Sequence, residues 1–262
     1  MCAPLVAALR DAGHAVGMAL SDRNRDIFAP GILAACHVLE RIPWPRHGST
    51  PESAHAARAA IGAANYDVAL IASEEPEAYE LASDIPQRVG FTTGWAKPLK
   101  SVWVFGKLTR RVARAATVHG SRAHEVETVF RLGAGLHAEP APTRDPRRLR
   151  PLIVSEPARR GEHVVVQLGR KWSAIGLDPA SAGAIVEALV ARGARLVVTP
   201  DTGAAHLAGM LGVPVVDCFP DADAPAQIAR WHPWAAPYLA LVAGELRGSG
   251  GVARMASAVD AL

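Results

Sequence analysis

Four residues of segment 195–219, Asp201, Thr202, Gly203 and His206, are of types and at a spacing that could hold an anionic ligand. They lie between two apolar runs, which predict buried strands with a turn and a short helix between them. A turn of this kind directs backbone N–H groups to the carboxyl end of a parallel sheet, where a helix N-terminus binds anions. We therefore predict a diphosphate site at this turn.

The predicted site uses mainly backbone groups at the start of the short helix. The N–H groups expected to face the ligand belong to Thr202, Gly203, Ala204 and Ala205. Gly203 lets the ligand approach the backbone because it has no Cβ atom, and Thr202 adds a hydroxyl donor. The two small alanines keep the entrance clear, and His206 follows in the first turn. A structural alternative stays open here: Asp201 and Thr202 could simply cap the helix.

Apolar strands alternate with helices along the chain. Strands are expected at 14–20, 38–42, 67–72, 163–168, 195–199 and 215–219, and helices at 4–10, 50–62, 124–132, 178–191 and 204–211. This alternation is typical of parallel sheets covered by helices, so we predict an α/β fold. Four prolines between residues 139 and 151 indicate a linker, which divides the chain into domains 1–150 and 151–262.

Composition excludes several classes of protein. The 262 residues have a net charge of +3, which is too small to indicate nucleic acid as the main partner. Half of the residues are hydrophobic, as in an ordered globular chain. We find neither an apolar run that could span a bilayer nor the pattern of a signal peptide. We therefore expect a cytoplasmic protein.

The strongest charge cluster is the basic stretch 95–114. It contains six basic and three aromatic residues and no acid: Lys97, Lys100, Lys107, Arg110, Arg111 and Arg114, with Trp95, Trp103 and Phe105. It interrupts the predicted alternation of strands and helices. The simplest interpretation is a solvated basic surface. A functional interpretation is peripheral contact with an anionic membrane or a phosphorylated acceptor.

An acidic pair, Asp221 and Asp223, has the spacing of some metal-binding motifs. These two carboxylates are the only metal ligands that the motif supplies, and a metal site needs more than two. We therefore expect no metal site, and we expect no other cofactor. The three cysteines, Cys2, Cys36 and Cys218, are not at metal-ligand spacing either.

The order of residues in segment 195–219 is specific. Asp201, Thr202, Gly203, His206 and Ala208 are followed by Leu211, Gly212 and Pro214. This pattern resembles the signature of glycosyltransferase family 9, the heptosyltransferase-like enzymes. Further elements resemble that family in order and spacing over most of the chain: Lys171-Trp172, Arg230 to Trp234, His124 to Glu127, and Arg88-Val89-Gly90. Each of these alone could be a surface or core feature, but together they favour the family.

This resemblance implies a GT-B-like fold, in which two Rossmann-like domains with mainly parallel sheets face each other across a cleft. It also implies that Lys171 contacts the phosphates of a nucleotide-sugar donor on the second domain, a role that suits a compact cation. Asp201 and His206 are then the catalytic candidates, which would contact sugar hydroxyls or phosphate. The acceptor would enter from the first domain.

Two parts of that family's pattern are not found in the sequence. The family opens with a strand and a Gly-Asp loop whose aspartate acts as general base, and because Pro4 matches the proline that follows, the loop would lie before Met1. Between the strand at 163–168 and Asp201 we expect one helix, where the family has a further helix and strand that hold the nucleotide base. Both domains are therefore expected to be trimmed.

The residues and the resemblance together predict a glycosyltransferase. It would transfer a sugar, such as heptose from ADP-heptose, to a cell-envelope glycan or lipid-linked acceptor, with inversion and without a metal. The alternative is a catalytically inactive nucleotide-sugar binding or interaction protein with the same fold. In both cases Lys171 and the N–H groups of residues 202–205 form the donor site.

Overall fold

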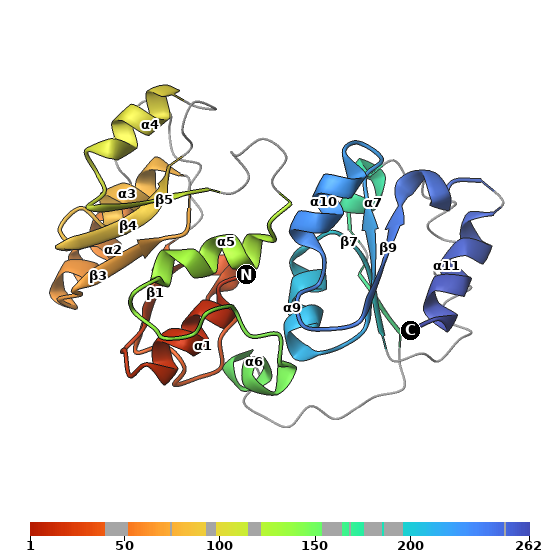
Figure 1. Ribbon diagram of the computed structural model, residues 1–262, viewed down its shortest axis with the longest axis horizontal. Helices are drawn as coiled ribbons and strands as arrows, with labels where there is room; N and C mark the ends of the chain where they lie inside the picture. Colours follow the sequence, from red (N-terminus) through yellow and green to blue (C-terminus); the bar gives the residue numbers. More distant parts are fainter. Residues whose placement is uncertain are drawn as a thin grey trace.

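The computed structural model describes residues 1–39, 52–73, 75–92, 98–114, 122–153, 164–167, 169–175, 185, 196–248 and 250–262. These residues form two α/β halves (Figure 1). Helices α1 (Ala3–Asp11), α5 (Glu125–Phe130) and α6 (Pro146–Ile153) lie between the sheets of the two halves.

Strands and helices alternate through the first half. After α1 come β1 (Gly17–Ser21), η1 (Asp22–Asn24), β2 (Ala35–Leu39), α2 (Glu52–Ala63), β3 (Val68–Ile71), α3 (Pro76–Leu81), β4 (Gln87–Thr92), α4 (Pro98–Phe105), β5 (Arg110–Ala113), α5 and η4 (Arg131–Gly133). β1 pairs with β2, whereas β3, β4 and β5 form a second sheet, and all of these pairs are parallel.

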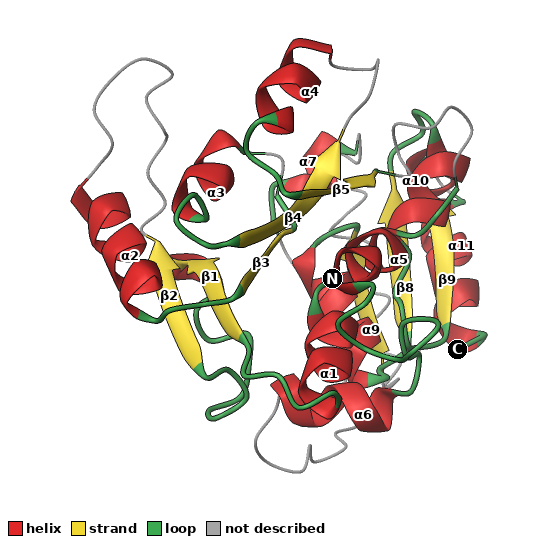
Figure 2. Cartoon of the chain, turned by 60° about the vertical axis from the view of Figure 1, so that its left-hand side comes forward, coloured by secondary structure: helices red, strands yellow, loops and turns green. Residues whose placement is uncertain are grey.

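The two sheets of the first half resemble one doubly wound sheet without its central strand. In the order 3-2-1-4-5-6 of such sheets, the first strand lies between the second and the fourth. Here β2-β1 corresponds to one side of that order and β3-β4-β5 to the other (Figure 2). No strand of the described ranges pairs with both β1 and β3.

Side chains connect these two sheets. The hydroxyl of Tyr66, which precedes β3, lies 2.8 Å from Nε2 of His37 on β2. The same hydroxyl lies so close to Gly17 of β1 that a Cβ atom there would collide with it. Val16 and Leu70 pack in one apolar cluster with residues of α1. The first half is therefore joined by packing where its backbone ladders are separate.

The second half has one continuous sheet. β6 (Val164–Val166), β7 (Leu196–Pro200), β8 (Val215–Phe219) and β9 (Tyr238–Val242) pair in parallel and in chain order. α7 (Lys171–Ala174) follows β6, α9 (Gly203–Leu211) joins β7 to β8, and α10 (Ala224–Trp231) joins β8 to β9; η5 (Ala243–Leu246) and α11 (Gly251–Asp260) follow. In the main core, buried side chains of three neighbouring strands pack against α11: Val198 of β7, Val216 of β8 and Leu241 of β9.

Helix α6 packs against both halves. Its Leu149 and Leu152 lie in an apolar cluster with Ala7 of α1 and Met210 of α9. The stretch predicted as a linker therefore contains a packed helix. The predicted domain boundary between residues 150 and 151 falls inside it.

The predicted α/β fold with parallel sheets is confirmed, but some elements were missed. The basic stretch 95–114 does not interrupt the alternation, since its described part forms α4 and β5. β5 is an edge strand with exposed arginines, so it lacks the apolar run that identifies a buried strand. β4, β9, α10 and α11 were not predicted either. Except for Ile185, the predicted helix 178–191 lies outside the described residues.

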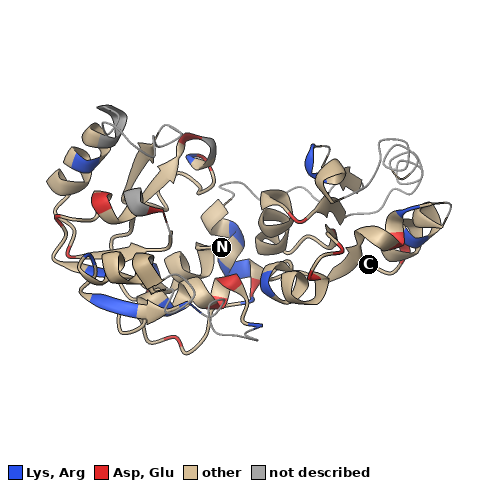
Figure 3. Cartoon of the chain, turned by 90° about the horizontal axis from the view of Figure 1, so that it is seen from above, with Lys and Arg blue, Asp and Glu red and all other residues tan. Residues whose placement is uncertain are grey.

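Basic and acidic residues are interspersed in both halves (Figure 3). Among the described helices, none combines the length and the apolar character that crossing a membrane requires.

Candidate functional site

The strand, turn, helix and strand predicted for segment 195–219 are confirmed as β7, α9 and β8. Thr202 is the N-cap residue of α9, and its Oγ1 accepts a hydrogen bond from the Ala204 N–H at 3.3 Å. Gly212 ends the helix in the left-handed region, with φ 73°, a conformation that glycine adopts without strain. Thr202 therefore caps the helix, as the structural alternative based on the sequence proposed.

Capping leaves other N–H groups at the start of α9 without an internal partner. Within the described ranges, the N–H groups of Thr202, Gly203 and Ala205 donate no hydrogen bond. Gly203 is exposed, and a Cβ atom there would meet nothing within 4 Å. Ala205, in contrast, is fully buried, so it lies beneath the entrance rather than beside it. The helix start is open at Gly203, where N–H groups and the helix dipole favour an anion.

Lys171 reaches this helix start from the neighbouring strand. It is the first residue of α7, which follows β6, and β6 pairs with β7. Its Nζ donates to the carbonyl oxygen of Asp201 and lies 3.5 Å from Asp201 Oδ2. The Lys171 side chain is 46% exposed. The structure thus brings the predicted cation to the predicted anion site, where it pairs with Asp201.

His206 lies beside Asp201 but is not a second cation. Its Nε2 is 3.7 Å from Asp201 Oδ1, which is longer than a hydrogen bond. Burial lowers the pKa of His206 to about 3, so the imidazole is neutral at pH 7. Burial also raises the pKa of Asp201, and the nearby Lys171 partly opposes this shift. Among the predicted site residues, Lys171 alone carries positive charge.

The sequence prediction missed Gln167, which follows β6. Its Oε1 accepts hydrogen bonds from the hydroxyls of Thr199 and Thr202, the latter at 2.5 Å. Its backbone carbonyl accepts a hydrogen bond from Trp172 Nε1 at 2.7 Å. Gln167 therefore fixes both the N-cap residue of α9 and the residue beside Lys171. A polar residue at the end of a predicted strand was the available signal.

Asp217 was missed as well. It lies on β8 with 0% exposure, opposite Thr199 of β7, and neither carboxyl oxygen has a hydrogen bond of normal geometry in the described chain. Burial, followed by the negative charge of Asp201, raises the pKa of Asp217 to about 8. The carboxyl group is therefore mainly protonated at pH 7 and adds little charge to the site.

Two further elements of the family resemblance, His124 to Glu127 and Arg230 to Trp234, contact each other between the two halves. The Nε2 of His124 lies 2.8 Å from the carbonyl oxygen of His232, and burial lowers the pKa of His124 to about 4. The Glu125 carboxylate lies 2.5 Å from Arg114 Nη2 and 3.1 Å from Arg230 Nε, with its own side chain 6% exposed. These residues join α5 to α10 and the following loop. The contacts of His124 and Glu125 link the two halves, and the Trp231 ring at the end of α10 lies 6.0 Å from the His206 ring, centre to centre.

The Arg88-Val89-Gly90 element shapes β4. The Arg88 guanidinium donates to the carbonyl oxygens of Ile85 and Lys107. A Cβ atom on Gly90 would lie 2.9 Å from Leu108 Cδ2, so a larger residue here would displace the buried Leu108 side chain. The structure gives this element a role in the fold, away from the start of α9.

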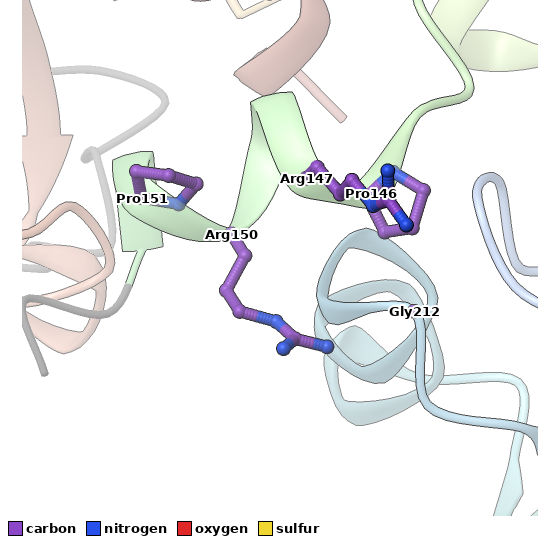
Figure 4. A pocket seen from close by; sticks show the side chains of 5 residues that line it. All are labelled: Pro146, Arg147, Arg150, Pro151 and Gly212. Atoms are coloured by element: carbon purple, nitrogen blue, oxygen red, sulfur yellow. The ribbon is translucent and has the colours of Figure 1, made fainter. Parts of the chain in front are cut away.

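A surface hollow at the other end of α9 is a poor candidate for the site. It measures about 250 Å³ and is lined by Pro146, Arg147, Arg150, Pro151 and Gly212 (Figure 4). The Arg150 guanidinium is already hydrogen-bonded to the carbonyl oxygen of Leu211, the last residue of α9. Among the described residues, His, Cys, Asp and Glu side chains form no group of three that could hold a metal ion. The N-terminal end of α9 is therefore the better supported site.

Comparisons by sequence give no match. No protein-family model matches the chain, and the search of curated proteins finds no similar sequence.

Comparison of structures does give matches. E. coli heptosyltransferase WaaC with ADP has a TM-score of 0.63 and 18% identity, over 96% of this chain and 93% of the other. The family 9 glycosyl transferase from Veillonella parvula has a TM-score of 0.61 and 12% identity, over 99% and 92%. E. coli ADP-heptose lps heptosyltransferase II has a TM-score of 0.59 and 13% identity, over 99% and 94%. The resemblance seen in the sequence is thus confirmed at the level of the fold, and this chain has the GT-B-like α/β fold of the heptosyltransferases.

Proposed function

We propose that this chain is a glycosyltransferase that binds a nucleotide-diphosphate sugar at the start of α9. One observation carries the proposal: Lys171 and the open N-terminus of α9 meet at the carboxyl ends of two neighbouring parallel strands. Ligands of doubly wound folds bind at that edge of the sheet. The similar fold of a heptosyltransferase with ADP supports the same kind of ligand.

The proposed chemistry is stabilisation of a diphosphate leaving group. The N–H groups of Thr202 and Gly203 would donate to phosphate oxygens, and Lys171 would exchange its contact with Asp201 for a phosphate. Positive groups held in place before the reaction stabilise the charge that develops on the leaving group. Asp201 and the neutral His206 would then be available to sugar hydroxyls. Because Lys171 and the helix start supply the positive charge, we propose transfer without a metal.

The finer assignment follows the similar structures and the sequence. We propose heptose from ADP-heptose as the donor sugar, inversion at the anomeric carbon, and a cell-envelope glycan such as lipopolysaccharide core as the acceptor. The donor would bind the domain that we place at 151–262, and the acceptor would enter from 1–150. A cytoplasmic location fits a nucleotide-sugar substrate.

A second candidate function is nucleotide-sugar binding without transfer. It is favoured by the state of the carboxyl groups near the start of α9, since Asp201 is paired with Lys171 and Asp217 is mainly protonated. Without a bound donor, neither is a free general base. An assay of ADP release from ADP-heptose, with and without acceptor glycan, distinguishes the candidates, because only the transferase gives acceptor-dependent release.

The donor site is tested with Lys171→Ala. A charge-assisted contact is worth ~1.5–3 kcal/mol, so affinity for ADP or UDP should fall by roughly ten-fold or more. The measurement is calorimetric titration of both nucleotides. Arg170→Ala is the matched control, because Arg170 is the adjacent exposed cation. Melting temperatures of both variants should stay near wild type, and equal affinity of wild type and Lys171→Ala would exclude Lys171 from the site.

A further inference from the structure

Helix α4 presents an apolar face to solvent. Leu99, Val102 and Phe105 are 87%, 75% and 60% exposed, and Trp103 is 39% exposed. On the other side of the helix, Val104 is 1% exposed and packs in the core of the first half. Residues three apart lie on one side of a helix. Leu99, Val102 and Phe105, bordered by Trp103, therefore form one continuous surface, the apolar face of α4.

This clustering is unusual for the molecule. The other exposed large apolar residues of the described chain are spread over several elements: Ile27, Val38, Val165, Leu207 and Leu262. Single exposed apolar side chains are ordinary, whereas a contiguous group marks an interaction surface. α4 stands at the outer rim of the first half (Figures 1 and 2), and its Leu99, Val102 and Phe105 are the most exposed large hydrophobic residues of the described chain.

Basic side chains border the apolar face. The Cζ atom of Arg111 lies 3.4 Å from the centre of the Phe105 ring, and Arg111 forms no ion pair with a described residue. Lys107 Nζ lies 5.5 Å from the centre of the Trp103 ring and also bonds Glu80. An available cation therefore sits at the edge of an exposed aromatic and aliphatic surface.

Two other arginines of the basic stretch, Arg110 and Arg114, are less available to bind a partner than the sequence indicates. Arg110 donates to the carbonyl oxygens of Leu132 and Ala134. Arg114 is paired with the buried Glu125. The described part of the stretch is thus not a uniform cationic surface, and its apolar residues are the larger exposed feature.

We propose that the apolar face of α4 inserts into the surface of an anionic phospholipid bilayer, with Arg111 contacting the headgroups. An apolar helix face bordered by basic residues is the composition of a helix that lies in the membrane interface. Tryptophan is enriched at that depth. A second copy of the chain fits less well, because pairing two such faces would bring two Arg111 side chains together, whereas anionic lipid complements them.

The inference adds a partner to the proposed function without depending on transfer. Membrane insertion through α4 would place the acceptor-side half at the bilayer, where a lipid-linked acceptor is held. Binding to vesicles is measured without any nucleotide sugar. Failure of vesicle binding and failure of donor binding are therefore separate results.

The test is co-sedimentation with vesicles of phosphatidylcholine, with and without phosphatidylglycerol, at low and physiological salt. The double variant Leu99→Glu/Val102→Glu should reduce partitioning by about ten-fold or more, since it replaces inserted apolar side chains by acids. Arg111→Glu should reduce partitioning several-fold on anionic vesicles and little on neutral ones. Matched controls are Leu262→Glu, an exposed apolar residue elsewhere, and Arg147→Glu, the same charge change on α6. Both controls should bind as wild type does.

Three results would overturn the inference. The first is absence of wild-type binding to anionic vesicles at low salt. The second is equal partitioning of wild type and the Leu99→Glu/Val102→Glu variant. The third, measured by analytical ultracentrifugation, is self-association that this variant abolishes while no form binds vesicles, which would assign the face to a second copy. Melting curves check that all variants are folded, which the high exposure of both substituted side chains favours.

Discussion

The two halves of the molecule position their strands in different ways. In the second half, β6, β7, β8 and β9 are hydrogen-bonded in one sheet, whereas in the first half β1-β2 and β3-β4-β5 are separate. The ends of β6 and β7, which position Gln167, Lys171 and Asp201, are therefore held by the main chain. β1 and β3 are held by side-chain packing, including the contacts of Tyr66.

This difference indicates how each half responds to substitution. A backbone ladder fixes geometry regardless of most side chains, so changes in the second sheet should act mainly through charge and burial. Side-chain contacts are replaceable one by one, so the first half should show smaller and more local effects. Three substitutions test this comparison, in order of decreasing expected effect.

The largest effect is expected from Asp217→Asn in the continuous sheet. The folded pKa of Asp217, about 8, lies above the unfolded value of about 3.9, so its stabilising contribution is complete below pH ~4 and lost as pH rises through 8. The loss is on the order of 5 kcal/mol. Because asparagine stays neutral, the free energy of unfolding of the variant should increasingly exceed that of wild type from about pH 4 to about pH 8, with a constant difference above that range. Urea denaturation across pH measures this.

The control for this variant is Asp223→Asn, an exposed residue of the same half. Its curve should run parallel to wild type. His124 and His206 act in the opposite direction, because their folded pKa values of about 4 and about 3 lie below 6.5 and their contribution is lost as pH falls. Wild-type stability should therefore be greatest near pH 6–7. Parallel curves for Asp217→Asn and wild type would show that this carboxyl group is not buried as described.

A smaller effect is expected at the contact between the halves. Glu125→Gln removes the carboxylate that Arg114 and Arg230 share and leaves their guanidinium groups without it. Breaking a buried ion pair from one side costs about 3 kcal/mol or more. The free energy of unfolding should fall by this amount, and small-angle scattering should show a larger radius if the halves separate. Glu139→Gln, at a partly exposed ion pair with Arg148, should change stability by less than ~1 kcal/mol.

The smallest effect is expected between the two sheets of the first half. Gly17→Ala places a Cβ atom against the Tyr66 hydroxyl and should cost about 1–3 kcal/mol, because Tyr66 must leave His37. In a Tyr66→Ala background the same change should cost much less. The double-mutant cycle isolates this contact. An equal cost in both backgrounds would mean that Tyr66 does not link β1 to β3.

Local sequence determined what could be predicted of the site. The turn around Asp201 and the helix after it were predictable because an N-cap residue, a C-terminal glycine and two apolar runs all act within a few residues. Lys171 was identified because the Lys171-Trp172 element resembles the pattern of glycosyltransferase family 9. The structure shows its contact with Asp201, a residue on another strand.

Other features depend on partners far along the chain. Asp217 lies in a strand that was correctly predicted as buried, but the lack of a hydrogen bond of normal geometry to its carboxyl oxygens depends on the elements that cover it. Glu125 meets Arg230 across 105 residues, which no local pattern indicates. β5 was missed because a strand at the sheet edge tolerates exposed arginines, so it carries no apolar signal.

The separation of β1 from β3 also bears on how the protein behaves at high concentration. In the part of the chain that the structure describes, the two sheets of the first half have open edges on β1, β2, β3 and β5, whereas the single sheet of the second half has them only on β6 and β9. Rows of unpaired N–H and C=O groups are templates on which other chains add strands. Stocks of the purified protein should therefore lose solubility first through contacts of the first half, and substitutions that place lysine beside these edges should slow precipitation without affecting the second sheet.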